Sequence, residues 1–301
     1  MNPTDSQQLR LGLVCITASQ AVRYRTITRK RLLQLSPAEQ KDRLRSLYAE
    51  NIQRLKGAIE FCLKHQIYLY RLNGGVFPFC DVELGESILA EFQEELRQIG
   101  DRAINSGVRL VMHPPQFVVL NSDSPQVVAN SRKILAAHAL ILDYLGQERS
   151  PWAALNIHGG KGNRREQLVQ QIAALPTAVR SRLTLENDES TYSAQAILDI
   201  CQAASVPMVF DAHHHVVCED LDSYDHESVG EMLAAARFTW PDHQLVHISN
   251  GRTHLNDPQH SDFIEVMPSS YVNAPWIEVE AKKKELAIEK LRQEWQPLKS
   301  D

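Results

Sequence analysis

The sequence lacks long apolar runs and the start of a secretory signal. No window approaches the ~18 uninterrupted apolar residues that a bilayer crossing needs, so we expect no membrane span. Residues 1–5 do not show the basic-then-apolar order of a signal peptide, which predicts a cytoplasmic protein. The 301 residues are 43% hydrophobic and 23% charged, the balance of an ordinary globular protein.

Cysteine is scarce, and a dinucleotide-binding glycine motif is missing. The chain has five cysteines, scattered and odd in number, which favours free thiols in a reducing compartment over a disulfide framework. No Gly-x-Gly-x-x-Gly follows the first apolar stretch, residues 11–16, so we expect no nucleotide cofactor. No linker rich in proline, glycine or serine divides the chain, and a single domain over residues 1–301 is the simplest prediction.

The chain also lacks an excess of positive charge, since its formal net charge is −5. A local basic surface can still bind phosphates when acidic side chains elsewhere dominate the sum. Residues 23–31 hold five basic groups with Tyr24 among them, and they follow the first predicted strand. This segment is interpreted either as a solvated loop or as a phosphate-contacting one.

Apolar stretches alternate with amphipathic helical patterns along the chain. The helix patterns cover residues 36–64, 88–106, 125–145, 165–175, 193–203, 228–237 and 282–295, and 296–301 is expected to be a frayed tail. The predicted strands are 11–16, 67–72, 108–112, 153–157, 183–185, 208–210, 245–248 and 276–280. This alternation predicts an α/β protein with a closed parallel (β/α)8 TIM barrel, its core at about residues 10–285.

Imidazoles and carboxylates stand where the predicted strands end. Six of them lie 45, 28, 25, 36 and 33 residues apart, close to the ~30 residues of one βα unit, and two more follow strands six and seven. In a barrel these groups would converge on one mouth. They are His113, His158, Glu186, Asp211, His214, His247, His260 and Glu280.

Divalent metal ions explain this set better than chance does. A single histidine at a strand end is more often hydrogen-bonded than metal-bound, but packing all eight groups together without compensation is costly. Nitrogen and oxygen donors suit Zn²⁺, Mn²⁺ or Fe²⁺, and eight exceed what one ion takes. We therefore expect two or three ions, with Glu186 and Glu280 as bridges, a grouping that serves in-line displacement at phosphorus.

These segments resemble the ordered motifs of the UV damage endonuclease family. The resemblance spans roughly residues 10–285 and includes the Arg25-Thr26 loop, the segments 69–72 and 77–79, and seven strand-end motifs. The seven motifs are HPPQF at 113–117, IHGG at 157–160, LEND at 185–188, FDAHHH at 210–215, VHIS at 246–249, HSD at 260–262 and VEAK at 279–282. Seven motifs in order are specific where a single one would be weak.

The resemblance implies a barrel related to endonuclease IV and to xylose-isomerase-like proteins, with a multi-metal site usually associated with Mn²⁺. It implies incision of UV-damaged double-stranded DNA immediately 5′ to a photoproduct, leaving a 3′-hydroxyl. The eight strand-end groups would be the metal ligands, and we expect His113, Glu186, His247 and Glu280 to be catalytic. Gln116 and Phe117 match the pair that family members push into the duplex, and Arg25 lies in the expected DNA-binding loop.

The chain departs from the family at several positions. Leu245 stands where the family often has a modified lysine, so the ligand set is expected to be one group short. Leu13 and Thr17 replace a tyrosine and an asparagine near the lesion, and Pro115 replaces a common glycine. Two other functions therefore stay open: a metal-dependent sugar isomerase or epimerase on the same barrel, and a damage-binding paralogue that cleaves slowly.

Overall fold

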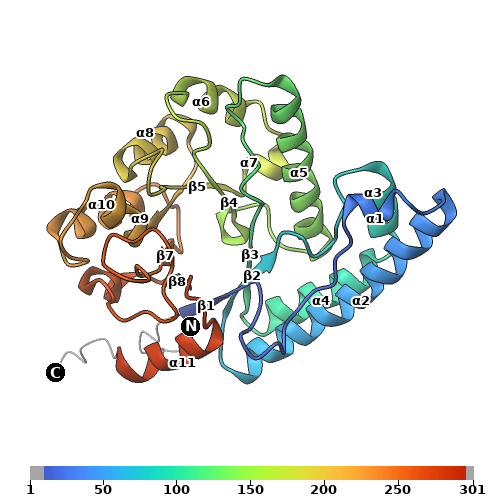
Figure 1. The fold of residues 1–301 in the computed structure, drawn as a ribbon, viewed down its shortest axis with the longest axis horizontal. Helices are drawn as coiled ribbons and strands as arrows, with labels where there is room; N and C mark the ends of the chain where they lie inside the picture. Colours follow the sequence, from blue (N-terminus) through green and yellow to red (C-terminus); the bar gives the residue numbers. More distant parts are fainter. Residues whose placement is uncertain (1–9, 296–301) are drawn as a thin grey trace.

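The computed structural model describes residues 10–295, and in this part of the chain eight parallel strands close into a barrel in chain order (Figure 1). The predicted tail at 296–301 and the segment 1–9 lie outside the described residues. The closed barrel confirms the predicted (β/α)8 fold. Its strands are β1 (Arg10–Val14), β2 (Leu69–Asn73), β3 (Arg109–His113), β4 (Leu155–His158), β5 (Leu183–Glu186), β6 (Met208–Asp211), β7 (Leu245–Ile248) and β8 (Trp276–Val279).

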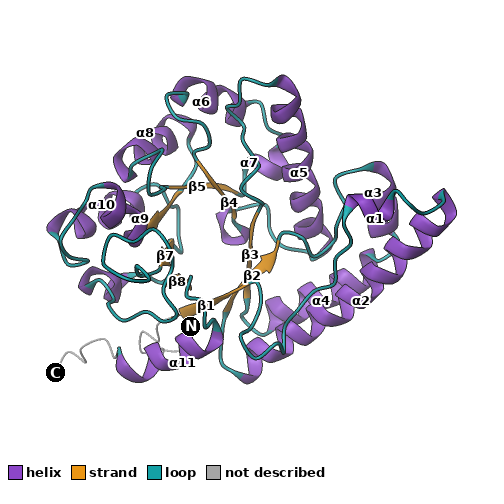
Figure 2. Ribbon diagram, in the orientation of Figure 1, coloured by secondary structure: helices purple, strands orange, loops and turns teal. Residues whose placement is uncertain are grey.

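Helices surround the barrel on its outside (Figure 2). The longest described helix, α2, begins with a capping box in which Ser36 and Glu39 satisfy each other's backbone N–H groups, and Pro37 fills its first turn. No helix in residues 10–295 is long and apolar enough to cross a membrane. The helices are α1 (Arg29–Leu32), α2 (Pro37–Lys64), α3 (Glu83–Ala90), α4 (Gln93–Asn105), α5 (Pro125–Tyr144), α6 (Arg165–Ala173), α7 (Thr177–Arg180), α8 (Ala194–Ala204), α9 (Ala212–Cys218), α10 (Glu227–Arg237) and α11 (Glu285–Glu294).

Four local predictions were wrong, and in the first of them the segment 23–31, expected to be a loop, ends in helix α1. The helix expected over residues 88–106 is two helices, α3 and α4, which are separated at Glu91 and Phe92. The segment 151–153 forms a 3₁₀ turn, so β4 begins two residues later than predicted. Helix α9 was missed because its three histidines suggested only a strand tip, whereas the Asp211 carboxylate accepts the N–H of His214 and caps a helix there.

The interior of the barrel changes from apolar to polar along its axis. Side chains on a strand alternate between the inside and the outside of a barrel. A separate apolar cluster includes Leu69, Val111, Ala154, Val209, Leu245 and Trp276, and it fills the end where the strands begin. One step further along β2, β7 and β8 are the charged or polar residues Arg71, His247 and Glu278, all buried. The strand tips follow, so most of the inward-facing polar groups gather toward the carboxyl end.

Arg109 closes the apolar end of the barrel from inside. The side chain is fully buried, and burial lowers its pKa to about 9. Its guanidinium donates to three backbone carbonyls, those of Pro151, Trp152 and His243. It also lies against three indole rings, with its Cζ 4.9 Å from the centre of Trp152, 5.4 Å from Trp276 and 5.8 Å from Trp240.

We expect Arg109→Met to lower the free energy of unfolding by about 3 kcal/mol or more, because three buried carbonyls lose their donor. Arg97→Met is the matched control, since Arg97 is half-exposed and forms an i,i+4 pair with Asp101, worth about 0.5 kcal/mol. Urea unfolding of both variants measures the difference. Equal losses for the two variants would contradict a structural role for Arg109.

Candidate metal centre

The eight strand-end groups predicted from the sequence meet at the carboxyl end of the barrel, around Glu186. Strand register brings them there, since His158 is aligned with Glu186 and Asp211 with His247 on neighbouring strands. Glu186 is 1% exposed. Four imidazoles surround its carboxylate: His247 Nδ1 at 2.9 Å, His113 Nε2 at 3.3 Å, His214 Nδ1 at 3.6 Å and His158 Nε2 at 4.0 Å.

Glu280 and His260 complete the group on its other side. The Glu280 Oε1 atom lies 3.4 Å from His247 Nδ1, and Oε2 lies 3.7 Å from His260 Nδ1. Asp211 is fully buried beside them. The structure therefore brings all eight residues together, and their role as ligands stays a prediction.

The donor atoms fit divalent ions. Ligand atoms of His113, His158 and Glu186 lie within 4.8 Å of one another, and so do those of Glu186, Asp211 and His247. Two buried atoms in these groups, Asp211 Oδ2 and His158 Nδ1, have no hydrogen-bond partner, which is rare for buried polar atoms. Two cations that share the Glu186 carboxylate would satisfy this geometry, and nitrogen and oxygen donors suit Mn²⁺, Zn²⁺ or Fe²⁺.

The imidazoles and the buried carboxylates shift each other's pKa values. Burial favours a neutral Glu186, but the imidazoles of His247 and His158 outweigh it and hold the pKa of the Glu186 carboxyl well below its usual range. Burial also opposes protonation of His214, yet Asp211 and Glu186 raise its pKa to about 9. Because ligands coordinate in their deprotonated form, ion binding would release these protons.

Neighbouring side chains orient the ligands, and the sequence analysis did not identify them. Asn156 donates to Glu186 Oε2 at 2.6 Å, and the Thr184 hydroxyl holds Asn156 in turn at 2.9 Å. The Asn187 carbonyl accepts from His214 Nδ1, which leaves Nε2 of that ring for an ion. Asn156 is a polar residue in an apolar strand two positions before His158, and this alternation was the available signal.

His213 fixes the loop that carries His260. Its Nε2 donates to the Asp257 carbonyl at 3.0 Å, and its Nδ1 accepts from the Tyr224 hydroxyl at 2.7 Å. An isolated β-bridge joins Gly251 to His260 across the base of the same loop. Of the three consecutive histidines, His213 therefore supports the loop and His214 faces Glu186.

A buried arginine lies under the centre and was not expected. Arg71 Nη2 lies 2.7 Å from Glu278 Oε2, 2.6 Å from Glu280 Oε1 and 2.9 Å from His247 Nε2. The sequence contained a sign of this buried ion pair. Arg71 and Glu278 are charged residues inside apolar strands, and Glu278 stands two positions before Glu280. Leu245 lies below this layer, in the apolar cluster.

The predicted DNA-contacting side chains lie on loops. Gln116 and Phe117 follow β3 after two prolines, and both are exposed, Phe117 by 67%. With this exposure, the Phe117 side chain is not packed inside its own loop. Leu13 and Thr17, by contrast, are fully buried and cannot contact a ligand through their side chains.

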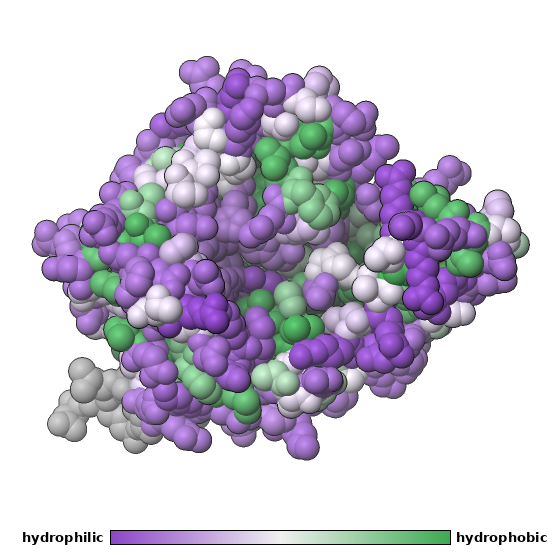
Figure 3. All heavy atoms as spheres, in the orientation of Figure 1, coloured by the Kyte–Doolittle hydropathy of each residue, from purple (hydrophilic) through white to green (hydrophobic). Residues whose placement is uncertain are grey.

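In the basic segment after β1, hydrogen bonds to the backbone fix the chain at Arg25 while the Arg25 side chain points outward. Asn51 is fully buried and bonds both the N–H and the carbonyl of Arg25, at 2.8 and 2.9 Å. The Arg25 side chain is 64% exposed and pairs with Glu50 at 3.1 Å. These two hydrogen bonds fix the backbone of the loop at Arg25. Figure 3 shows that most of the surface on this face of the molecule is hydrophilic.

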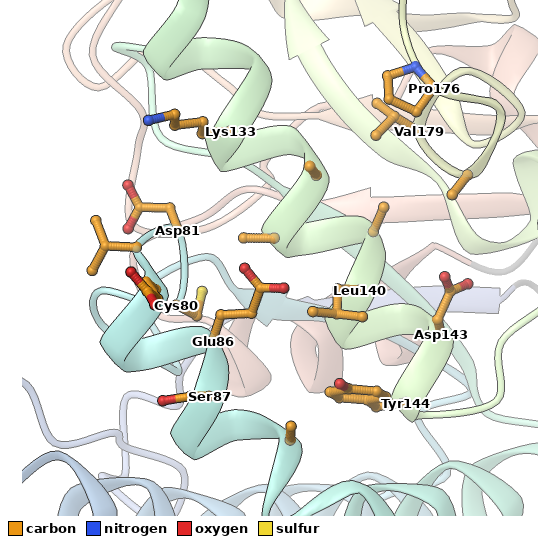
Figure 4. A pocket seen from close by; sticks show the side chains of 17 residues that line it. Cys80, Asp81, Glu86, Ser87, Lys133, Leu140, Asp143, Tyr144, Pro176 and Val179 are labelled. Carbon is orange, nitrogen blue, oxygen red and sulfur yellow. The ribbon is translucent and has the colours of Figure 1, made fainter. Parts of the chain in front are cut away.

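A separate groove of about 790 Å³ lies outside the barrel, between α3, α5 and α7 (Figure 4). Alanines and other apolar residues such as Leu140 and Val179 line much of it, and Asp81, Glu86 and Lys133 also line it. Neither compact group of metal-ligand donors includes one of its residues. Both donor groups therefore lie at the barrel mouth.

Comparison with known proteins agrees with the motifs. The family model described as UV-endonuclease UvdE matches residues 9–300. The chain is 52% identical over 292 residues to the UV DNA damage endonuclease of Nostoc sp. (strain PCC 7120), covering 96% of this chain and 91% of that one. It is 48% identical over 288 residues to the enzyme of the same name from Deinococcus radiodurans, covering 94% of each.

Two solved structures agree with the fold. The crystal structure of SacUVDE superposes with a TM-score of 0.80 and 25% identity, covering 95% of this chain and 99% of that one. Endonuclease IV from Thermus thermophilus gives a TM-score of 0.60 at 14% identity, covering 95% of this chain and 98% of that one. The second match shows the fold alone, and it confirms the predicted endonuclease IV-like barrel.

We expect Glu186→Gln to lose most of its bound Mn²⁺, because an amide cannot carry the charge that two ions would share. Glu285→Gln is the control: Glu285 is also buried, but its carboxylate accepts the N–H groups of Ala18 and Ser19 outside the centre. Elemental analysis after Mn²⁺ loading and gel filtration gives the metal content. Full content in Glu186→Gln would contradict the assignment.

Proposed function

Because the chain belongs to the UV-endonuclease UvdE family, we propose that it is a metal-dependent DNA repair endonuclease that cuts UV-damaged duplex immediately 5′ to a photoproduct. The observation that carries the proposal is the convergence of four imidazoles on the buried Glu186 carboxylate at the barrel mouth. Such a cluster suits a phosphodiester, whose hydrolysis develops negative charge on several oxygens.

In this proposal the ligands hold two divalent ions, and the ions supply the chemistry. Bound divalent ions would supply a hydroxide near neutral pH and positive charge beside the departing 3′-oxygen. Glu186 would hold both ions, with His113 and His158 on one of them and Asp211 and His247 on the other. Glu280, His214 and His260 lie around this pair, and Mn²⁺ is the ion we propose, with Zn²⁺ and Fe²⁺ as alternatives.

Lesion recognition is assigned to the loop after β3. Phe117 would wedge between base steps while Gln116 replaces the lost hydrogen bonds, and a poorly stacked photoproduct is the easiest dinucleotide to extrude. Arg25 would contact phosphate from its fixed loop. The five cysteines are free, in keeping with the cytoplasmic location we propose.

Incubation of the protein and Mn²⁺ with irradiated and unirradiated supercoiled plasmid tests the function. We expect nicking of the irradiated plasmid only, and its loss in EDTA because the ligands alone cannot activate water. Mapping the new 3′ end on a defined photoproduct duplex locates the cut. Equal nicking of both plasmids, or nicking that survives EDTA, would contradict the proposal, and tight lesion binding without incision would favour the damage-binding paralogue.

We expect Phe117→Ala to reduce discrimination for damaged duplex by about tenfold to a hundredfold, since stacking of one base on an aromatic ring contributes about 1–3 kcal/mol. Phe238→Ala is the matched control: Phe238 is 89% exposed but follows α10 before β7 begins, at the opposite end of the barrel. Competition binding with damaged and intact duplex measures both. Equal effects of the two substitutions would remove Phe117 from recognition.

A further inference from the structure

A second basic segment stands at the barrel mouth, where the loop after β4 leads into α6. It has the sequence KGNRR at residues 161–165, and it begins three positions after His158, which ends β4. The side chains of Lys161 and Arg164 are 51% and 42% exposed. Basic side chains on this face are therefore not confined to the loop after β1.

A buried amide fixes the backbone of the loop after β4. Asn121 is fully buried, and its Oδ1 atom accepts the N–H of Lys161 at 2.8 Å. Its Nδ2 atom donates to the carbonyls of Gly159 and Lys161, at 3.0 and 2.9 Å. The Tyr192 hydroxyl donates to the Lys161 carbonyl as well, at 2.8 Å. The backbone at Lys161 is thus held at both its N–H and its carbonyl, while half of the side chain is in contact with solvent.

Asn121 also connects this loop to the segment that we propose as a wedge. It belongs to the loop after β3, four residues beyond Phe117. Gly160 permits the connection, because a Cβ atom there would lie 2.5 Å from Asn121 Oδ1 and its φ of +77° favours glycine. The same buried side chain therefore sets the position of Lys161 relative to the loop that carries Phe117.

Lys161 and Arg164 share one exposed carboxylate. Asp123 lies in the loop after β3 and is 51% exposed; it forms an ion pair with Lys161, and its Oδ1 atom lies 2.6 Å from Arg164 Nη2. Two cations beside one anion leave an excess of one positive charge in this group. Exposed ion pairs contribute little to stability, so a phosphate can replace Asp123 while Asn121 keeps the backbone in place.

The order of the strands places this group beside the other proposed DNA contacts. β4 pairs with β3, so the loops that follow these two strands are neighbours at the mouth, and the loop with Arg25 lies on the other side of β3. A side chain that enters between base steps unstacks them and bends the duplex. Phosphate contacts fix the position of a protein on DNA without reading its sequence. Basic side chains on both sides of the Phe117 loop suit that task.

We propose that Lys161 and Arg164 form a second phosphate-binding site, which holds the DNA backbone on the β4 side of Phe117 while Arg25 holds it on the β1 side. The site reads no base, so it acts equally on damaged and intact duplex. Asp123 keeps the two side chains together until a phosphate replaces it. The inference rests on the DNA substrate of the proposed function, but not on its metal centre or on the position of the cut.

The salt dependence of duplex binding tests the site without any incision. Binding of damaged and intact duplex is measured by fluorescence anisotropy in EDTA at several salt concentrations. Each lost phosphate contact lowers the slope of log K against log salt by about 0.9. Arg164→Met should lower the slope by about that amount for both duplexes, and Lys161→Met/Arg164→Met by about twice as much.

Arg149→Met is the matched control for these variants. The Arg149 side chain is 57% exposed and pairs with Asp143, but it precedes β4 and so lies at the opposite end of the barrel. Its slope should equal that of the wild type. The comparison separates a contact with phosphate from the loss of one positive charge anywhere on the surface.

A substitution of the opposite sign tests the replacement of Asp123. Asp123→Asn removes the carboxylate that competes with phosphate, so both duplexes should bind more tightly. Asp101→Asn is its control, because Asp101 pairs with the exposed Arg97 on α4, near the start of β3. Weaker binding by Asp123→Asn, or the same change in both aspartate variants, would overturn the inference.

The outcomes also distinguish this inference from the proposed function. A wild-type slope in Lys161→Met/Arg164→Met, or a loss of affinity for damaged duplex alone, would overturn the second phosphate site and leave the endonuclease proposal intact. A wild-type protein that binds neither duplex at any salt concentration would overturn both.

Discussion

The burial of the Glu186 carboxylate is the constraint on which the rest of the centre depends. A lone carboxylate removed from water costs several kcal/mol even after relaxation. Here nitrogen atoms lie around it, those of imidazoles at the mouth and that of the Asn156 amide from below. This arrangement needs side chains from separate strands at one height, which the fixed register of a closed barrel provides.

The barrel buries two arginines, and it solves their desolvation in different ways. At the apolar end, Arg109 donates to backbone carbonyls and lies among indole rings, so its hydrogen bonds go to dipoles. Near the mouth, Arg71 meets full negative charges on Glu278 and Glu280. The first solution stabilises a fold without creating reactivity. The arrangement around Arg71 keeps opposite charges close together where ions and a phosphate would bind. Residues that stabilise the barrel thus lie at one end of its axis, and the proposed functional residues lie at the other end.

The sequence predicted the barrel and the eight converging groups because both follow from periodicity. Apolar strands every ~30 residues imply a closed parallel sheet, and strand ends then share one face. It did not predict α9. The helix begins because the Asp211 side chain accepts the N–H of His214, and the residue types alone do not distinguish such a cap from a strand end. It also passed over Arg71, Glu278 and Asn156, whose partners lie on other strands far along the chain, because a polar residue in a strand does not reveal its partner.

A negative net charge is compatible with the DNA contact that we propose for the loop after β1. The net charge of −5 is a sum over the whole molecule. Salt screens the interaction between a phosphate and exposed charges beyond about 8–10 Å, so only the charges near the binding surface matter. Near the β1 loop, Asn51 fixes the Arg25 backbone from within and Glu50 offers an exposed ion pair to its guanidinium. An exposed pair of this kind is worth about 0–1 kcal/mol, so a phosphate can replace Glu50 at little cost while the backbone stays in place. The loop that we propose as a DNA contact therefore needs no rearrangement of the Arg25 backbone to bind phosphate.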